Sequence, residues 1–174
     1  MKRILILGNC GAGKTTLAYQ IQKRTGLELV HLDQEYWQAG WVETHYLDWR
    51  EKVEQLAAKG TWIMDGNYRG TFDIRLPAAD TVIFLDRSRW LCLFRAVKRI
   101  LRYYGKTRPD MGVGCPERFD WEFLKYIYQF PELQRPKIWK HLEMLRPDQQ
   151  FFHLKNQKEL ALFLTMLNKE LGVN

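Results

Sequence analysis

The sequence predicts an α/β fold in which a five-stranded parallel sheet carries helices on both faces. Short apolar segments typical of buried strands alternate along the chain with longer segments of helical periodicity. We expect strands at residues 3–7, 28–32, 61–65, 80–85 and 150–154. We expect helices at residues 14–25, 46–59, 89–103, 120–130, 136–145 and 157–171. No linker or internal repeat interrupts this alternation, so residues 1–174 are predicted to form a single domain.

A glycine-rich segment follows the first predicted strand. Residues 8–15 read Gly-Asn-Cys-Gly-Ala-Gly-Lys-Thr, which matches the pattern G-x-x-x-x-G-K-T of the phosphate-binding P-loop. Gly11 and Gly13 permit successive N–H groups to point into one concavity, to which the following helix adds its positive end. Lys14 would reach the β- and γ-phosphates of ATP, and the Thr15 hydroxyl would bind Mg²⁺. The predicted nucleotide contacts are Gly8, Asn9, Cys10, Gly11, Ala12, Gly13, Lys14, Thr15, Thr16 and, after the last strand, Asn156.

Three predicted strands end in an aspartate, namely Asp33, Asp65 and Asp86. Ligands of parallel sheets bind beyond the carboxyl ends of the strands, where the P-loop also lies. A carboxylate beside a polyphosphate can hold Mg²⁺, usually through water, or accept the proton of an attacking hydroxyl. Aspartate is common in any turn after a strand, but three at one edge favour a functional role for at least two. We expect Asp33 to orient or deprotonate an acceptor and Asp65 to hold the metal's water shell.

Two segments are candidates for binding that acceptor: residues 33–60, and the sequence that follows the third strand. Trp37 could stack on a flat molecule, although indole rings pack in cores about as often. Arginine forks suit a carboxylate or phosphate, although a surface ion pair explains Arg69 alone equally well. The predicted acceptor-binding residues are Asp33, Trp37, Asp65, Asn67, Tyr68, Arg69 and Arg75.

The positive charge of the chain is concentrated in one stretch. The net charge is +7, and residues 87–108 contain eight basic residues and no acid. On a helix these residues form a positive face made of Arg95, Lys98, Arg99 and Arg102. The opposite face, predicted to pack on the core, comprises Leu93, Val97, Ile100 and Tyr104. A local anionic partner is therefore expected, either the phosphates of a nucleotide or the backbone of DNA.

A glycine-containing loop follows this helix, and residues 103–118 are predicted to form a mobile lid that carries Arg108. No motif that reads DNA bases is visible. No apolar run approaches the roughly 18 residues of a membrane span, and the chain begins directly with a strand, so neither a membrane segment nor a signal peptide is expected. The three cysteines lack the spacing of a disulfide framework or zinc site. We therefore expect a cytoplasmic protein, whose oligomeric state the sequence leaves open.

These motifs resemble the adenylate-kinase-like branch of the P-loop kinases and, more narrowly, the bacterial DNA topology modulation proteins (FlaR-like). The resemblance rests on residues 8–15, 31–33, 62–68 and 79–86 and on Arg95 with Arg99. It implies a P-loop NTPase three-layer sandwich with strand order 2-3-1-4-5. It also implies that Arg95 and Arg99, whose spacing matches that of the family's lid arginines, act on the transition state. It also implies that Asp33, like an aspartate of shikimate-type kinases, faces the acceptor hydroxyl.

Two main functions remain open at this point, beside the hydrolysis of a triphosphate without an acceptor. The first is a kinase that transfers the γ-phosphoryl group of Mg-ATP to an unidentified small molecule or nucleotide. Its predicted catalytic residues are Lys14, Asp33, Arg95, Arg99 and Arg108, and its predicted metal-binding residues are Thr15 and Asp65. The alternative is a nucleotide-binding regulator that affects DNA topology through the basic helix face.

Overall fold

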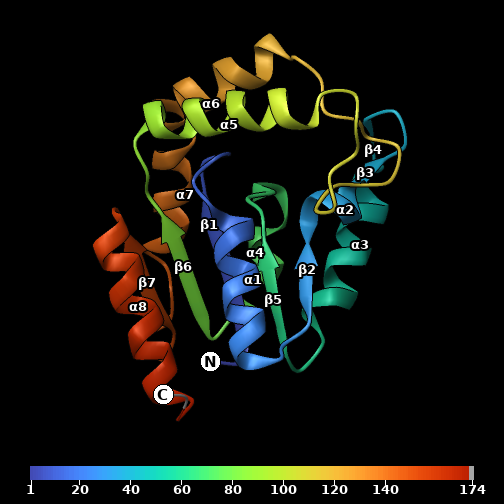
Figure 1. Ribbon diagram of the computed structural model, residues 1–174. Helices are drawn as coiled ribbons and strands as arrows, with labels where there is room; N and C mark the ends of the chain where they lie inside the picture. The colour runs from blue at the N-terminus through green and yellow to red at the C-terminus, as the bar shows by residue number, and fades with distance from the viewer. Residues whose placement is uncertain (173–174) are drawn as a thin grey trace.

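The computed structural model describes residues 1–172 and confirms the predicted α/β architecture (Figure 1). Five parallel strands form one sheet in the order β2-β5-β1-β6-β7. Their bounds are β1 (Arg3–Gly8), β2 (Leu29–His31), β5 (Trp62–Asp65), β6 (Thr81–Leu85) and β7 (Gln150–Leu154). This is the predicted order 2-3-1-4-5, because β5, β6 and β7 are the third, fourth and fifth strands of this sheet along the chain.

Helices cover both faces of the sheet. They are α1 (Lys14–Thr25), α2 (Leu32–Tyr36), α3 (Tyr46–Ala57), α4 (Phe72–Ala78), α5 (Arg89–Tyr103), α6 (Trp121–Leu133), α7 (Arg135–Leu142) and α8 (Gln157–Glu170). Successive side chains of a strand point to opposite faces. Ile4 and Ile6 of β1 therefore pack with α1 and α8, whereas Leu5 and Leu7 pack with α3, α4 and α7. The result is a three-layer sandwich with a core on each side of the sheet.

Short elements near the carboxyl edge of the sheet were absent from the prediction. Helices α2 and α4, a 3-10 turn at Arg69–Thr71 and the hairpin of β3 (Trp37–Gln38) and β4 (Val42–Glu43) are too short for a periodic pattern. One consequence corrects the prediction for Asp33. Strand β2 already ends at His31, so Asp33 lies in the first turn of α2 and not at a strand end.

Helix α6 continues one turn past its predicted end because a side chain replaces a missing backbone donor. Pro131 has no N–H, which leaves the carbonyl of Ile127 without its helical partner. The side chain of Asn9 lies beneath this point and its Nδ2 donates to Ile127 O at 2.9 Å. Asn9 is buried, so this bond ties the P-loop to α6 in a water-poor environment.

Helices α5 and α6 lie side by side above the carboxyl ends of the strands (Figure 1). The predicted core face of α5 is partly wrong. Ile100 is buried and Leu93 is half-buried, but Val97 and Tyr104 are 40% and 65% exposed. The helix instead buries Cys92, Ala96 and Ile100. Among the described residues, no helix combines the length and apolar character needed to cross a bilayer.

Candidate active site

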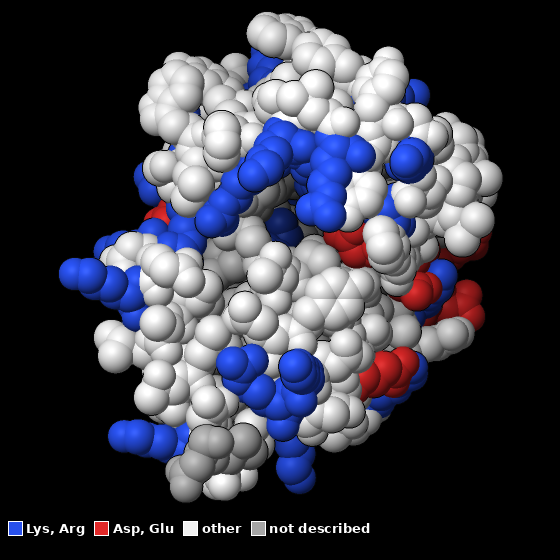
Figure 2. Space-filling model, in the orientation of Figure 1, with Lys and Arg blue, Asp and Glu red and all other residues white. Residues whose placement is uncertain are grey.

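One cavity of about 1130 Å³ lies between the carboxyl edge of the sheet and helix α5. Figure 2 shows a hollow in this face of the molecule, with Lys and Arg side chains arching over it. Most predicted site residues line the cavity: Cys10, Gly11, Ala12, Gly13, Lys14, Thr15, Thr16, Asp33, Trp37, Asp65, Asn67, Tyr68, Arg69, Arg95, Arg99 and Arg108. Residues predicted from separate motifs therefore meet in one space.

The P-loop has the backbone shape that phosphate binding requires. Gly11 and Gly13 have φ values of 80° and 102°, in the left-handed region that favours glycine. A Cβ on Gly11 would lie 2.4 Å from the carbonyl oxygen of Cys92, so α5 can pack on the loop only because this residue is glycine. Lys14 Nζ donates to the carbonyls of Gly8 at 3.0 Å and Asn9 at 3.1 Å. The loop amides and the N-terminus of α1 fit the phosphates of a nucleotide.

A buried chain of hydrogen bonds leads from the P-loop into the sheet. The Thr15 hydroxyl donates to Asp65 Oδ2 at 2.9 Å, and Asp65 Oδ1 lies 2.7 Å from His31 Nδ1. Burial alone would lower the pKa of His31, but the hydrogen bond and the charge of Asp65 outweigh it and raise this pKa. His31 was not among the predicted site residues. It ends strand β2, which lies next to the strand that ends at Asp65, so the predicted strand order could have suggested that the two side chains meet.

The oxygens of Thr15 and Asp65 suit Mg²⁺, which prefers one or two protein oxygens together with water and phosphate. Across residues 1–172, no group of three His, Cys, Asp or Glu side chains is arranged to hold a metal by itself. Thr15 and Asp65 thus offer two oxygens to a metal whose remaining ligands would be water and phosphate.

A second polar pair faces the cavity from the acceptor side. Tyr68 Oη donates to Asp33 Oδ1 at 2.7 Å. Burial raises the pKa of Asp33, and Asp65 adds to the shift, whereas the hydrogen bond from Tyr68 and the charge of Lys14 oppose it. Tyr68 has a φ of 30°, a backbone conformation that costs a non-glycine residue about 1 kcal/mol or more.

Arg75 supports this turn instead of lining the cavity, which corrects its predicted role. Its side chain is fully buried and donates to the carbonyls of Gly66, Asn67 and Tyr68. The guanidinium thus holds Tyr68 in its unusual conformation. Asn67 is also committed to the scaffold, because its amide pairs in both directions with the peptide of Gly8, at 3.1 and 3.0 Å.

Three further predicted nucleotide contacts lie outside the lining. Gly8 is buried behind the loop, with an added Cβ 2.5 Å from the carbonyl oxygen of Leu85, so it supports the loop by close packing. Asn9 faces α6 as described above. Asn156 caps helix α8 by accepting from the N–H of Glu159, and its neighbour Gln157 lines the cavity in its place.

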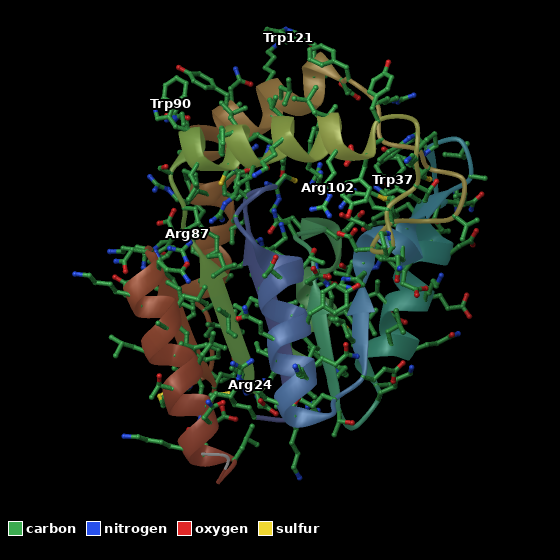
Figure 3. The ribbon with its side chains drawn as sticks, in the orientation of Figure 1. Arg24, Trp37, Arg87, Trp90, Arg102 and Trp121 are labelled. Carbon is green, nitrogen blue, oxygen red and sulfur yellow. The ribbon has the colours of Figure 1, made fainter. Side chains whose placement is uncertain are left out.

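The basic face of α5 turns toward the P-loop. Arg95 Nη1 lies 3.5 and 3.4 Å from the carbonyl oxygens of Gly11 and Ala12. In Figure 3, Arg102 projects from the side of α5 that faces the sheet. Four of the eight basic residues of 87–108 line the cavity, where phosphates would bind: Arg87, Arg95, Arg99 and Arg108.

Two lid acids hold the arginines and were missed by the sequence analysis. Glu117 is buried and forms ion pairs of 2.8 Å with both Arg99 Nε and Arg108 Nε. Asp110 Oδ2 lies 2.7 Å from Arg108 Nη1 and 3.4 Å from the Thr15 hydroxyl. Asp110 thus places a carboxylate beside the oxygen that we expect to bind the metal. The sequence did contain a signal for both residues: they are the first two acids after the acid-free basic stretch 87–108.

The loop between α5 and α6 packs on the hairpin of β3 and β4 (Figure 1). Gly40 donates its N–H to the carbonyl of Gly114 at 2.9 Å, and Trp41 Nε1 donates to the carbonyl of Pro116 at 3.0 Å. Gly112 approaches the backbone of Trp37 so closely that a Cβ would lie 2.1 Å from its carbonyl oxygen. The predicted lid is thus in a closed position, and its mobility stays a prediction.

Comparisons with known proteins identify the fold. No model of a protein family matches the chain, and no curated protein matches it. Shikimate kinase from Acinetobacter baumannii, in complex with shikimate, has a TM-score of 0.59 at 17% identity, over 99% of this chain and 94% of its own. A gluconokinase from Sinorhizobium meliloti has a TM-score of 0.51 at 17% identity, over 98% and 91%. Deoxyadenosine kinase from M. mycoides has a TM-score of 0.51 at 17% identity, over 96% and 98%. The chain therefore has the fold of P-loop kinases.

Proposed function

We propose that the protein is an ATP-dependent kinase that transfers the γ-phosphoryl group of Mg-ATP to a hydroxyl group of a small molecule. The observation that carries this proposal is a single cavity that joins the P-loop to the pair formed by Asp33 and Tyr68. A phosphate cradle alone suits many nucleotide-binding proteins. A second polar site in the same cavity is what a transfer reaction requires, because donor and acceptor must meet in line.

On the proposed donor side, the residues bind the phosphates and the metal or neutralise the negative charge of the phosphates. The P-loop amides and Lys14 bind the phosphates, and Thr15, with Asp65 through water, holds Mg²⁺. When bound, the metal supplies charge neutralisation on the phosphates. The arginines Arg95, Arg99 and Arg108 line the same cavity and neutralise the charge that develops on the transferred group.

The proposed acceptor side is organised around Asp33. Its raised pKa suits a group that accepts a proton from the attacking hydroxyl, and the hydrogen bond from Tyr68 fixes its orientation. Trp37 and Arg69 also line this cavity, so they can contact a flat or anionic part of the acceptor. Shikimate kinase, which shares the fold, was solved with the small hydroxylated molecule shikimate, in keeping with an acceptor of that size.

The alternative of direct DNA binding has less support. The face of α5 that carries Arg95 and Arg99 lines the cavity, and Arg99 is paired with the buried Glu117. Arg95, Lys98 and Arg102 are exposed, but Arg95 reaches the P-loop carbonyls, where it is placed for the phosphates of a bound nucleotide. The basic face is therefore better suited to nucleotide phosphates than to a DNA backbone.

The first experiment is to measure ADP release from Mg-ATP with and without a panel of acceptors: nucleosides, nucleoside monophosphates, hydroxylated carboxylates, sugars and duplex DNA. We expect one class of small molecule to raise the rate at least tenfold. Lys14→Ala should abolish both this rate and nucleotide binding, because it removes the only ammonium group that lines the cavity within residues 1–172. Lys23→Ala is the matched control, since Lys23 lies exposed on the same helix.

Wild-type turnover in Lys14→Ala would refute the kinase proposal. If duplex DNA alone raised the rate, and bound more weakly at high than at low salt, the regulator would replace the kinase as the explanation.

A further inference from the structure

Helix α5 presents an unusual outer face. Trp90, Phe94, Val97 and Leu101 follow one another at intervals of four, three and four residues, which places them in one stripe along the helix. Their exposed fractions are 68%, 66%, 40% and 76%. Arg95 and Arg99 line the cavity, and Cys92, Ala96 and Ile100 are buried, so the helix carries a second apolar stripe that faces solvent.

Helix α6 extends the same apolar surface. Trp121 and Tyr128 are 68% and 44% exposed, and the rings of Trp90 and Tyr128 meet edge to face with centroids 5.6 Å apart. Figure 3 shows Trp90 and Trp121 pointing away from the sheet. In Figure 2, the upper edge of the molecule, above the arch of Lys and Arg side chains, is mostly white. We call this surface the α5–α6 face, defined by Trp90, Phe94, Val97, Leu101, Trp121 and Tyr128.

The size of this face matches what a stable dimer buries. From the exposed fractions, its six side chains present roughly 700 Å² to solvent, taking 150–250 Å² for each large side chain. Apolar patches on monomeric proteins are usually smaller than about 600 Å². A standard protein interface buries about 800 Å² per partner. A ligand of small-molecule size could not cover such a face.

We propose that a second copy of this chain covers the α5–α6 face, so that two α5–α6 pairs form a four-helix bundle around a twofold axis. A twofold interface is built from the same patch on both subunits, which a contiguous two-helix face supplies. Its charges also suit self-association. At 100° per residue, Lys98 falls on the edge of α5 that points away from α6, and the exposed Glu122 falls on the far edge of α6. When α5 lies against the partner's α6, the positive edge meets the acid.

An anionic membrane is a poorer partner for the same face. Glu122 and Glu132 are both more than half exposed on α6 and would face the lipid head groups. The repulsion of these two carboxylates opposes the attraction of Lys98 and Lys125.

Sedimentation velocity on the full chain, from about 1 to 100 μM, tests the proposal. We expect a dimer at about 10 μM. Leu101→Glu and Phe94→Glu should each raise the dissociation constant by about 100-fold, because each places a charge at the centre of an apolar interface. Leu162→Glu is the matched control: Leu162 lies on α8, outside the α5–α6 face, and its exposure of 69% is close to the 76% of Leu101.

Circular dichroism of each variant checks that the substitution leaves the fold intact, which we expect because the substituted side chains are exposed. A wild-type chain that stays monomeric at 100 μM would overturn the proposal, and so would a dimer that both α5 variants leave unchanged. Flotation with vesicles of phosphatidylcholine and phosphatidylglycerol covers the membrane alternative. A monomer that binds these vesicles, and loses binding in Leu101→Glu, would replace the dimer with a lipid surface.

Discussion

Gly112 sets how closely the lid can approach the β3–β4 hairpin. A Cβ at this position would lie 2.1 Å from the carbonyl oxygen of Trp37, whereas ordinary van der Waals contact begins near 3.4 Å. Both atoms are fixed to the backbone, so no rotamer change relieves the clash. Overpacking of this kind costs about 1–3 kcal/mol. We therefore expect Gly112→Ala to lower the population of the closed lid, relative to the open lid, by about 5- to 150-fold.

Two measurements check this expectation. Amide hydrogen exchange in residues 104–118 should become faster, because the backbone bonds between the lid and the hairpin open more often. Turnover with the identified acceptor should fall by at least tenfold while nucleotide affinity changes little, since Arg108 lies on the lid and the P-loop does not. Gly60→Ala is the control, because its Cβ would meet no atom within 4 Å. Unchanged exchange and turnover in Gly112→Ala would show that the lid does not need this close contact.

Three further predictions concern buried polar groups. The folded-state pKa of Asp33 is raised, so ionisation of this carboxyl lowers the free energy of unfolding as pH rises from the ordinary pKa through the raised one. The free energy of unfolding of Asp33→Asn, relative to that of the wild type, should therefore increase across this pH window. Turnover should be lost at every pH. Glu117→Gln leaves two arginines poorly paired and should lose about 3 kcal/mol in thermal unfolding, a deficit that Mg-ATP reduces. Asn9→Ala should lose about 1–3 kcal/mol, and adding Pro131→Ala should recover part of it in a double-mutant cycle.

The sheet could be predicted because its signals are local. The apolar run Ile4 to Leu7 and the P-loop spacing each lie within a few consecutive residues, and the strand order followed from the resemblance to P-loop kinases. The direction of individual polar side chains could not be predicted in this way. Asn9 stands beside a cavity residue in sequence and Arg75 lies five residues after one, yet each satisfies backbone carbonyls inside the protein. Which carbonyls lack a partner depends on a distant proline or an unusual turn, and neither is visible in the pattern around the residue itself.

Periodicity separated the basic residues of α5 from its apolar residues, but it did not say which of the apolar residues point inward. The usual assumption that the apolar residues of a helix are all buried fails here because the helix borders a cavity lined by arginines: Cys92, Ala96 and Ile100 are buried, but a second apolar stripe is exposed. Arg95 and Arg99 must point toward the P-loop to meet phosphates, and this requirement turns Trp90, Phe94 and Leu101 outward. The exposed apolar stripe is therefore a geometric consequence of the phosphate site. A partner on the α5–α6 face would then bury the stripe and also hold the helix that carries the arginines, which gives association a direct route to the site.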